Sequence, residues 1–323
     1  MLWLLAAVVV CLAQSTAVAA PGAKTLEGFK ALDFISGFPK KGQLSFSFSE
    51  QFVYVLDDGN SCLYKFDAKG GTVTEHKEHI LQCYNKDSDG KGYAGIALDN
   101  VGNVFITQKS PGKVFEVNAN TGKVMRQVAR LPGATAAATD LKRNELYVAA
   151  AKKGKSSAIY RFRQLRHPSH SPRQSLYARL PGTPTKMAIA GDGTIYATVG
   201  SVVYKVPYHR KGAVEPSVLL DSIEELSAIA IGPADTKIVV SNAKGEITTI
   251  NTDTLEKKTI LSDGSEISCL ALGPDGCYYA TLVEGIIKLS DRPDGSCSRA
   301  DAEDNYTEAD YAEFVKVHAL GTA

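Results

Sequence analysis

Residues Gly95–Thr107 read Gly-Ile-Ala-Leu-Asp-Asn-Val-Gly-Asn-Val-Phe-Ile-Thr, two apolar runs separated by a polar turn that contains glycine. This pattern indicates two antiparallel strands joined by a tight turn. The pattern recurs six times at intervals of about 40 to 50 residues, which is typical of a β-propeller. The second apolar run of each unit is found at Phe52–Val55, Val104–Thr107, Leu146–Ala149, Ile195–Thr198, Ile238–Ser241 and Tyr278–Thr281.

Each unit continues with further alternating runs, so we expect an all-β protein, a six-bladed β-propeller with four-stranded blades. In unit one the expected fourth strand is Thr72–Glu75. Unit six lacks a clear fourth strand, whereas Phe29–Ile35 precedes unit one and resembles the strands that precede the other units. We predict that this N-terminal strand closes the ring, which removes an exposed sheet edge. The alternating segment Glu313–His318 is the alternative closing strand.

The two ends of the chain differ from the repeats. Leu2–Leu12 is an apolar run, and Ala17-Val18-Ala19 fits a signal-peptide cleavage site after Ala19. We therefore expect a signal peptide at 1–19, the propeller at 20–297 and an acidic tail at 298–323, which can add one strand. The rest of the chain has no run of the ~20 apolar residues that a membrane helix needs. The sequence predicts a secreted or luminal protein with no membrane span, and Asn305 is its acceptor site for N-glycosylation.

Charge is balanced overall but uneven locally. The formal net charge is +1, which does not favour a nucleic-acid partner. Unit three is strongly basic, and two interpretations stay open: a surface for an anionic glycan, or a solvated strand face. Lys152, Lys153 and Lys155 lie in a loop on the face where propellers usually bind ligands. The basic residues of the unit are Lys142, Arg143, Lys152, Lys153, Lys155, Arg161, Arg163, Arg166, Arg173 and Arg179.

Five cysteines follow the predicted cleavage site, and an odd number in a secreted chain leaves one as a free thiol or for an intermolecular disulfide. In a propeller, successive connections alternate between the two faces of the ring. Cys62 and Cys83 are expected on one face, and Cys277 and Cys297 on the other. We predict the disulfides Cys62–Cys83 and Cys277–Cys297, and a buried free thiol at Cys269.

The repeated units resemble the six-bladed propellers of the SMP-30/gluconolactonase and NHL-repeat group. The resemblance rests on Gly95–Thr107 and Leu270–Ala280, and it is architectural. Lactonase members of this group hold a divalent metal ion with a Glu on the first inner strand, an Asn in a Pro-Asn-Gly segment, and an Asp. Here Gln43 and Leu44 stand at the Glu position, and Asn242 is the nearest equivalent of the Asn. The resemblance implies the fold, and these departures argue against inherited lactonase activity.

One loop has part of a calcium-binding pattern. Asn85, Asp87 and Asp89 place oxygen ligands at alternate positions before Gly90, as in the first half of a calcium loop. The position at which an EF-hand needs its bidentate Glu is Ile96, so only an irregular calcium site is compatible with the sequence. The alternative is a solvated turn.

Polar residues near the expected channel mouth could form a binding site or a metal site. We consider two functions: a secreted recognition module for an extracellular protein or an anionic glycan, and a metal-dependent hydrolase with a rearranged carboxylate set. Neither a nucleophile elbow nor a phosphate-binding loop appears in the sequence. The candidates on the ligand-binding face, besides the three lysines, are Asp57, Asp58, Gln108, Glu224, Glu225, Asn242, Glu266 and Glu284.

Overall fold

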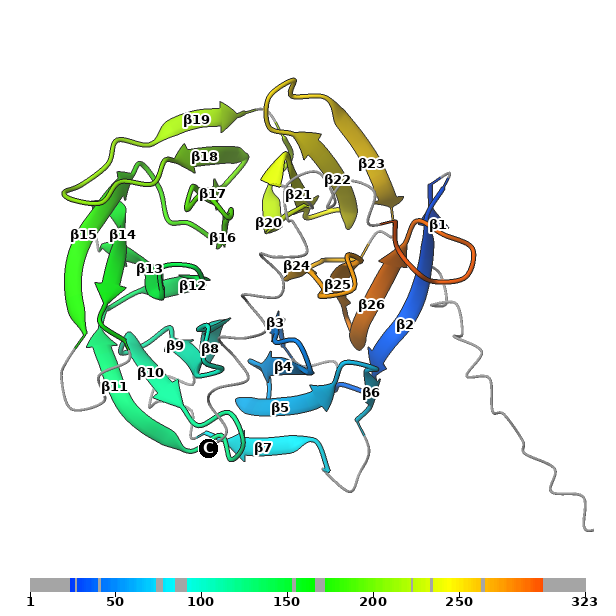
Figure 1. Ribbon diagram of the computed structural model, residues 1–323, viewed down its shortest axis with the longest axis horizontal. Helices are drawn as coiled ribbons and strands as arrows, with labels where there is room; N and C mark the ends of the chain where they lie inside the picture. The colour runs from blue at the N-terminus through cyan, green and yellow to red at the C-terminus, as the bar shows by residue number, and fades with distance from the viewer. Residues whose placement is uncertain are drawn as a thin grey trace, which may run out of the picture.

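Six sheets are arranged as blades around a central axis in the computed structural model (Figure 1), which confirms the six-bladed propeller. The innermost strands of neighbouring blades contact one another all the way around the axis. The structure describes residues 24–26, 28–39, 42–73, 78–84, 92–152, 155–165, 172–221, 223–232, 235–262 and 265–298.

Blades 1 to 3 each have four antiparallel strands, named a to d from the axis outward. Blade 1 contains β3 (Leu44–Phe48), β4 (Phe52–Asp57), β5 (Cys62–Asp67) and β7 (Ile80–Cys83). Blade 2 contains β8 (Tyr93–Leu98), β9 (Val104–Gln108), β10 (Lys113–Val117) and β11 (Val124–Arg130). Blade 3 contains β12 (Ala134–Asp140), β13 (Glu145–Lys152), β14 (Lys155–Arg163) and β15 (Arg173–Leu180).

Blades 4 to 6 repeat this arrangement, and blades 5 and 6 each gain a short extra strand. Blade 4 contains β16 (Lys186–Ile189), β17 (Ile195–Val199), β18 (Val202–Val206) and β19 (Ser217–Leu220). Blade 5 contains β20 (Leu226–Ile231), β21 (Lys237–Asn242), β22 (Glu246–Asn251), β23 (Lys257–Ser262) and β1 (Lys24–Thr25). Blade 6 contains β24 (Leu270–Leu272), β25 (Tyr278–Leu282), β26 (Gly285–Ser290), β2 (Lys30–Ser36) and β6 (Gly71–Thr72).

The hydrophobic core is divided among the six interfaces between neighbouring blades. Side chains of the b strands alternate between the two adjacent interfaces: Phe105 of β9 packs toward blade 3, and Ile106 packs toward blade 1. Strands buried on both faces therefore carry near-continuous apolar runs, which is why the b strands are the clearest repeats in the sequence.

The N-terminal strand closes the ring, as predicted. β2 pairs antiparallel with β26, and Leu32 lies opposite Lys288. Ile35 is 1% exposed and packs in a cluster with Val53 of blade 1 and Ile286 of blade 6. The chain start and the last blade are thereby joined. Residues 313–318, the alternative closing strand, lie outside the described residues.

The prediction of the fourth strand of blade 1 at Thr72–Glu75 was wrong. That strand is β7, whereas β6 crosses to blade 6 and pairs in parallel with the end of β2. The chain leaves blade 1 at Gly70, whose φ is +78°. A Cβ atom at this position would lie 2.0 Å from the Phe34 carbonyl oxygen, so glycine permits the close approach.

Both predicted disulfides are present. Cys62 joins Cys83 between β5 and β7 with a Cα–Cα distance of 4.0 Å, and Cys277 joins Cys297 with a Cα–Cα distance of 5.3 Å. Cys269 is free but half-buried, not fully buried as expected, with its Sγ 3.8 Å from the Phe46 carbonyl oxygen. Nowhere in the described part of the chain is there a helix long and apolar enough to span a membrane.

Candidate functional site

The turns between b and c strands and the connections from d to a strands lie at one end of the central channel, called here the mouth. Lys109, in the b–c turn of blade 2, donates from Nζ to Asp58 Oδ2 of blade 1 at 3.0 Å. Gly92 makes room for this carboxylate, because a Cβ there would lie 1.7 Å from Asp58 Oδ1. Asp58, a predicted candidate, is thus held in an ion pair between two blades.

Lys186 is the group that sequence reasoning missed. It is the first residue of β16 in blade 4, and its Nζ donates to Ser45 Oγ of β3 in blade 1 at 3.0 Å. Blades 1 and 4 lie opposite each other in the ring, so this hydrogen bond crosses the channel (Figure 1). A lysine at the start of an apolar strand resembles an ordinary strand end. Only the assembled ring shows that it points to the axis.

The surroundings of Lys186 change its pKa. Burial among the inner strands lowers the pKa of its ammonium group, since a charged group loses hydration there. Cys269 raises this pKa, the Lys109 ammonium lowers it, and Asp58 raises it. The mouth therefore brings together two ammonium groups, one carboxylate and one thiol from four blades.

Asp57 has a structural role. Its Oδ1 accepts from the backbone N–H of Gly59 at 2.9 Å, and its Oδ2 accepts from Nδ2 of Asn60 at 3.0 Å. Burial raises the pKa of this carboxyl, and these hydrogen bonds oppose the rise. Asp57 therefore stabilises the b–c turn of blade 1, as Asp residues commonly do in turns.

The predicted glutamates do not converge. Glu224 accepts from Lys244 Nζ at 2.5 Å on the exposed surface, and Glu225 is exposed. Glu266 is exposed, and its Oε1 accepts from Nε2 of Gln43 at 3.1 Å. Glu224 and Glu266 thus use surface partners in blades 5 and 1.

Asn242 also stabilises the turn that contains it, the b–c turn of blade 5. Its Nδ2 donates to Glu246 Oε2 at 2.7 Å, and its Oδ1 accepts two backbone N–H groups at 3.0 Å each. Glu284 is exposed in the b–c turn of blade 6. Within the described ranges, no three His, Cys, Asp or Glu residues lie close enough to hold a metal ion. The described part of the mouth does not fit the divalent ion of the lactonase-type propellers, because its carboxylates stand apart from one another.

Several predicted residues cannot be placed. Asn85, Asp87, Asp89, Lys153 and Asn305 lie outside the described residues, as do the signal peptide and residues 299–323. The backbones of Lys152 and Lys155 are paired across the b–c turn of blade 3. The calcium loop and the glycosylation site stay predictions.

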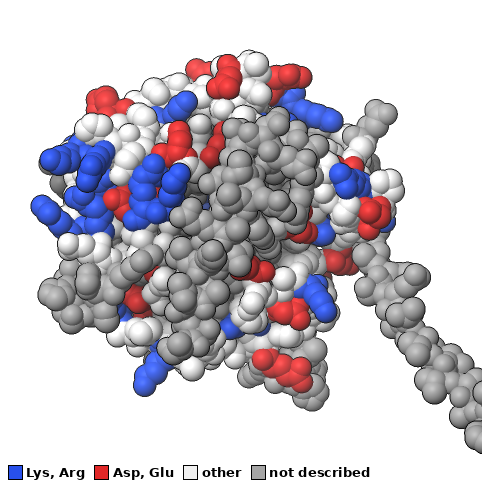
Figure 2. Space-filling model, viewed as in Figure 1, with Lys and Arg blue, Asp and Glu red and all other residues white. Residues whose placement is uncertain are grey.

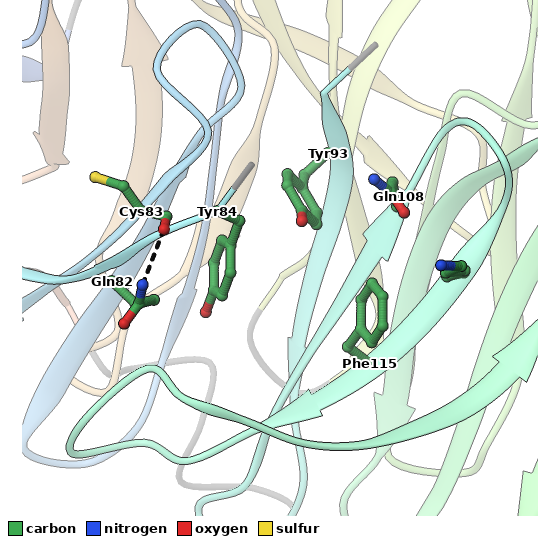
Figure 3. Close-up of a pocket in the computed structure, with 7 residues that line it drawn as sticks. Gln82, Cys83, Tyr84, Tyr93, Gln108 and Phe115 are labelled. Carbon is green, nitrogen blue, oxygen red and sulfur yellow. Dashed lines mark hydrogen bonds between the residues drawn. The ribbon is translucent and has the colours of Figure 1, made fainter. Parts of the chain in front are cut away.

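Gln108 lines a pocket of about 460 Å³ between blades 1 and 2 (Figure 3). The ring centroids of Tyr84 and Tyr93 lie 5.3 Å apart there with the rings tilted by 50°, and the Tyr84 hydroxyl donates to the Gly122 carbonyl at 2.7 Å. Gln108 thus faces the space between two blades. The lining residues are Gln82, Cys83, Tyr84, Tyr93, Gln108, Lys113 and Phe115.

Basic side chains gather at the other end of the ring, around the a–b turns and c–d connections of blades 3 and 4. Figure 2 shows Lys and Arg over β14, β15 and the chain between β18 and β19. This is the opposite end from the loop that contains Lys152 and Lys155. We call the surface the basic face. Its members, exposed or half-buried, are Lys142, Arg143, Arg163, Arg173, Lys205, Arg210 and Lys211.

Arg161, a basic residue of unit three, is 1% exposed and does not belong to this surface. Its NH1 donates to the His209 carbonyl at 2.7 Å, and its NH2 donates to the Arg210 carbonyl at 3.0 Å. The hydroxyl of Tyr177 also accepts the backbone N–H of His209 at 3.0 Å. Arg161 and Tyr177 of blade 3 therefore fix the backbone of the chain between β18 and β19 by hydrogen bonds, while Arg210 and Lys211 are exposed.

Arg143 ties the two blades of the basic face together. Its NH1 forms an ion pair with Asp140 Oδ2 at 2.7 Å, and its NH2 donates to the Asp192 carbonyl at 3.0 Å. Its guanidinium carbon lies 4.0 Å from the ring centroid of Tyr208, a cation–π contact. The surface is thus a fixed arrangement of charges on two joined blades.

Comparison with known proteins shows the fold but not the family. Neither a protein-family model nor a curated protein matches the sequence. A gluconolactonase from Xanthomonas campestris aligns over 84% of this chain and 96% of its own, with 11% identity and a TM-score of 0.65. The chain shares its fold.

Other solved structures with this fold have different activities. A virginiamycin B lyase from Staphylococcus aureus aligns over 81% of this chain and 99% of its own, with 14% identity and a TM-score of 0.55. An auxiliary nutrient binding protein from Bacteroides thetaiotaomicron aligns over 79% of this chain and 69% of its own, with 10% identity and a TM-score of 0.60. Two enzymes and a binding protein share the architecture, so function must be argued from the side chains.

Proposed function

We propose that the protein is a secreted recognition module that binds an anionic glycan through the basic face of blades 3 and 4. The observation that carries this proposal is the gathering of exposed Lys and Arg side chains on two blades that Arg143 joins. Such a surface attracts polyanions, and arginine pairs well with sulfate and carboxylate groups.

The rigidity of the surface supports the same proposal. Arg161 and Tyr177 hold the chain between β18 and β19, so Arg210 and Lys211 lose little backbone freedom on binding. Two disulfides suit an oxidising compartment, and the leader-like sequence at 1–19 supports secretion. An extracellular glycan is a partner that such a protein would meet.

The test is binding to immobilised heparin at several NaCl concentrations. We expect the double variant Arg210→Glu/Lys211→Glu to bind about tenfold more weakly at 0.15 M NaCl, where charges still interact over about 8 Å. The matched control is Lys257→Glu/Lys258→Glu, which reverses two exposed charges on β23 of blade 5. Equal losses in both variants would mean that only net charge matters, and unchanged binding would refute the basic face.

The alternative is a metal-dependent hydrolase, which rests on the shared fold. The described mouth does not assemble the carboxylates that such a site needs. Native mass spectrometry of the mature protein, with and without chelator, tests this alternative. A stoichiometric calcium ion that leaves on chelation, with affinity lowered by Glu224→Ala, Glu266→Ala or Asn242→Ala, would favour the hydrolase.

A further inference from the structure

Within the part of the chain that the structure describes, the Lys186 ammonium group at the channel mouth makes one hydrogen bond. An ammonium group carries three N–H donors, and the structure shows one of them bonded, to Ser45 Oγ. Among the described residues, no carboxylate lies within ion-pair distance of Lys186 Nζ. Charges enclosed by protein are normally paired, because removing them from water is costly. Lys186 departs from that rule.

The neighbouring charges do not correct the imbalance. Asp58 interacts with Lys186 electrostatically, but its Oδ2 is already in an ion pair with Lys109 at 3.0 Å. The Lys109 ammonium adds positive charge near Lys186, and Cys269 is the remaining titratable neighbour. Lys186 and Lys109 therefore face one carboxylate, Asp58, so the immediate surroundings of Lys186 carry a net positive charge. Among the described residues, Lys186 Nζ bonds to Ser45 alone.

We propose that the mouth binds a small oxyanion, a carboxylate or phosphate group, which accepts hydrogen bonds from Lys186 Nζ. As a whole residue Lys186 is half-buried, and its Nζ lies between blades 1 and 4 in the central channel. Ser45 fixes the ammonium group near the axis, where a bound anion would be surrounded by inner strands and poorly screened by solvent. This site lies at the opposite end of the ring from the basic face and is independent of it.

The experiment measures the thermal midpoint of unfolding in sodium chloride, sodium phosphate and sodium acetate at equal ionic strength. An anion present at tenfold excess over its Kd should raise the midpoint by about 3 °C for a domain of this size. A rise with phosphate alone identifies a phosphate-group ligand, a rise with acetate alone identifies a carboxylate, and a rise with both identifies a general oxyanion site.

Variants locate the effect. Lys186→Met keeps the length of the side chain and should abolish the rise, and Lys186→Arg should keep it. Lys244→Met, at an exposed lysine, and Arg210→Glu/Lys211→Glu, on the basic face, should also keep it. The proposal is overturned if neither anion raises the midpoint of the wild-type protein, or if Lys186→Met retains the rise. A rise lost only in the basic-face variant would assign the anion to that surface instead.

Discussion

The closing strand provides the sharpest test of how this ring is held together. Ile35 is 1% exposed and packs between blades 6 and 1. Ile35→Ala removes three buried carbon atoms and leaves a cavity, so we expect the free energy of unfolding to fall by about 3–4 kcal/mol. For a domain of this size, that loss corresponds to a thermal midpoint lower by about 6–12 °C.

The assay is guanidinium unfolding followed by far-UV circular dichroism, with two reference variants. Ile247→Ala, at a residue that is 0% exposed in blade 5, should cost a similar amount. Val218→Ala, at a residue that is 55% exposed, should change the free energy of unfolding by less than about 0.5 kcal/mol. If Ile35→Ala behaves like Val218→Ala while Ile247→Ala is costly, β2 does not close the ring.

Three further predictions follow from single features. Burial lowers the pKa of Lys186 in the folded protein below its ordinary 10.5, so the unfolded chain holds more protons between the two pKa values. The free energy of unfolding should therefore rise with pH across that interval, and Lys186→Met should abolish this part of the rise in pH-dependent melts. Replacing both Cys62 and Cys83 by Ser frees a loop of 21 residues, which should cost about 3 kcal/mol in denaturant unfolding, without loss of the far-UV spectrum. Thr281→Val removes a hydroxyl oxygen that receives two backbone N–H groups before β24, and calorimetry should show a loss of about 1–3 kcal/mol, whereas Thr281→Ser should retain most of the stability.

Much of the fold was predictable because the b strand of each blade buries both of its faces. The runs predicted at Val104–Thr107, Leu146–Ala149 and Ile195–Thr198 lie within β9, β13 and β17, since apolar runs and polar turns mark their limits. The two disulfides were predictable from the face on which each connection lies. Strand limits and the order of connections depend on residues that are close in the sequence, so they can be predicted without the structure.

The site was less predictable because it depends on which residues meet across the ring. Ser45 and Lys186 are brought together only when six blades close, and no sequence spacing encodes this contact. The sequence placed Arg161 among the basic residues of unit three. In the structure it is buried, because it donates to two backbone carbonyls of the next blade. Asp57 and Asn242 looked like ligands, but each uses its oxygens within its own turn.

Ring closure by β2 also has a consequence for biosynthesis. Leu32 emerges early from the ribosome, but its partner Lys288 is synthesised about 250 residues later, so this contact is among the most non-local in the chain. At a synthesis rate of about 5–20 residues per second, β26 is made on the order of ten seconds or more after β2. During that interval β2 is an unpaired strand edge, and such edges can pair with other chains.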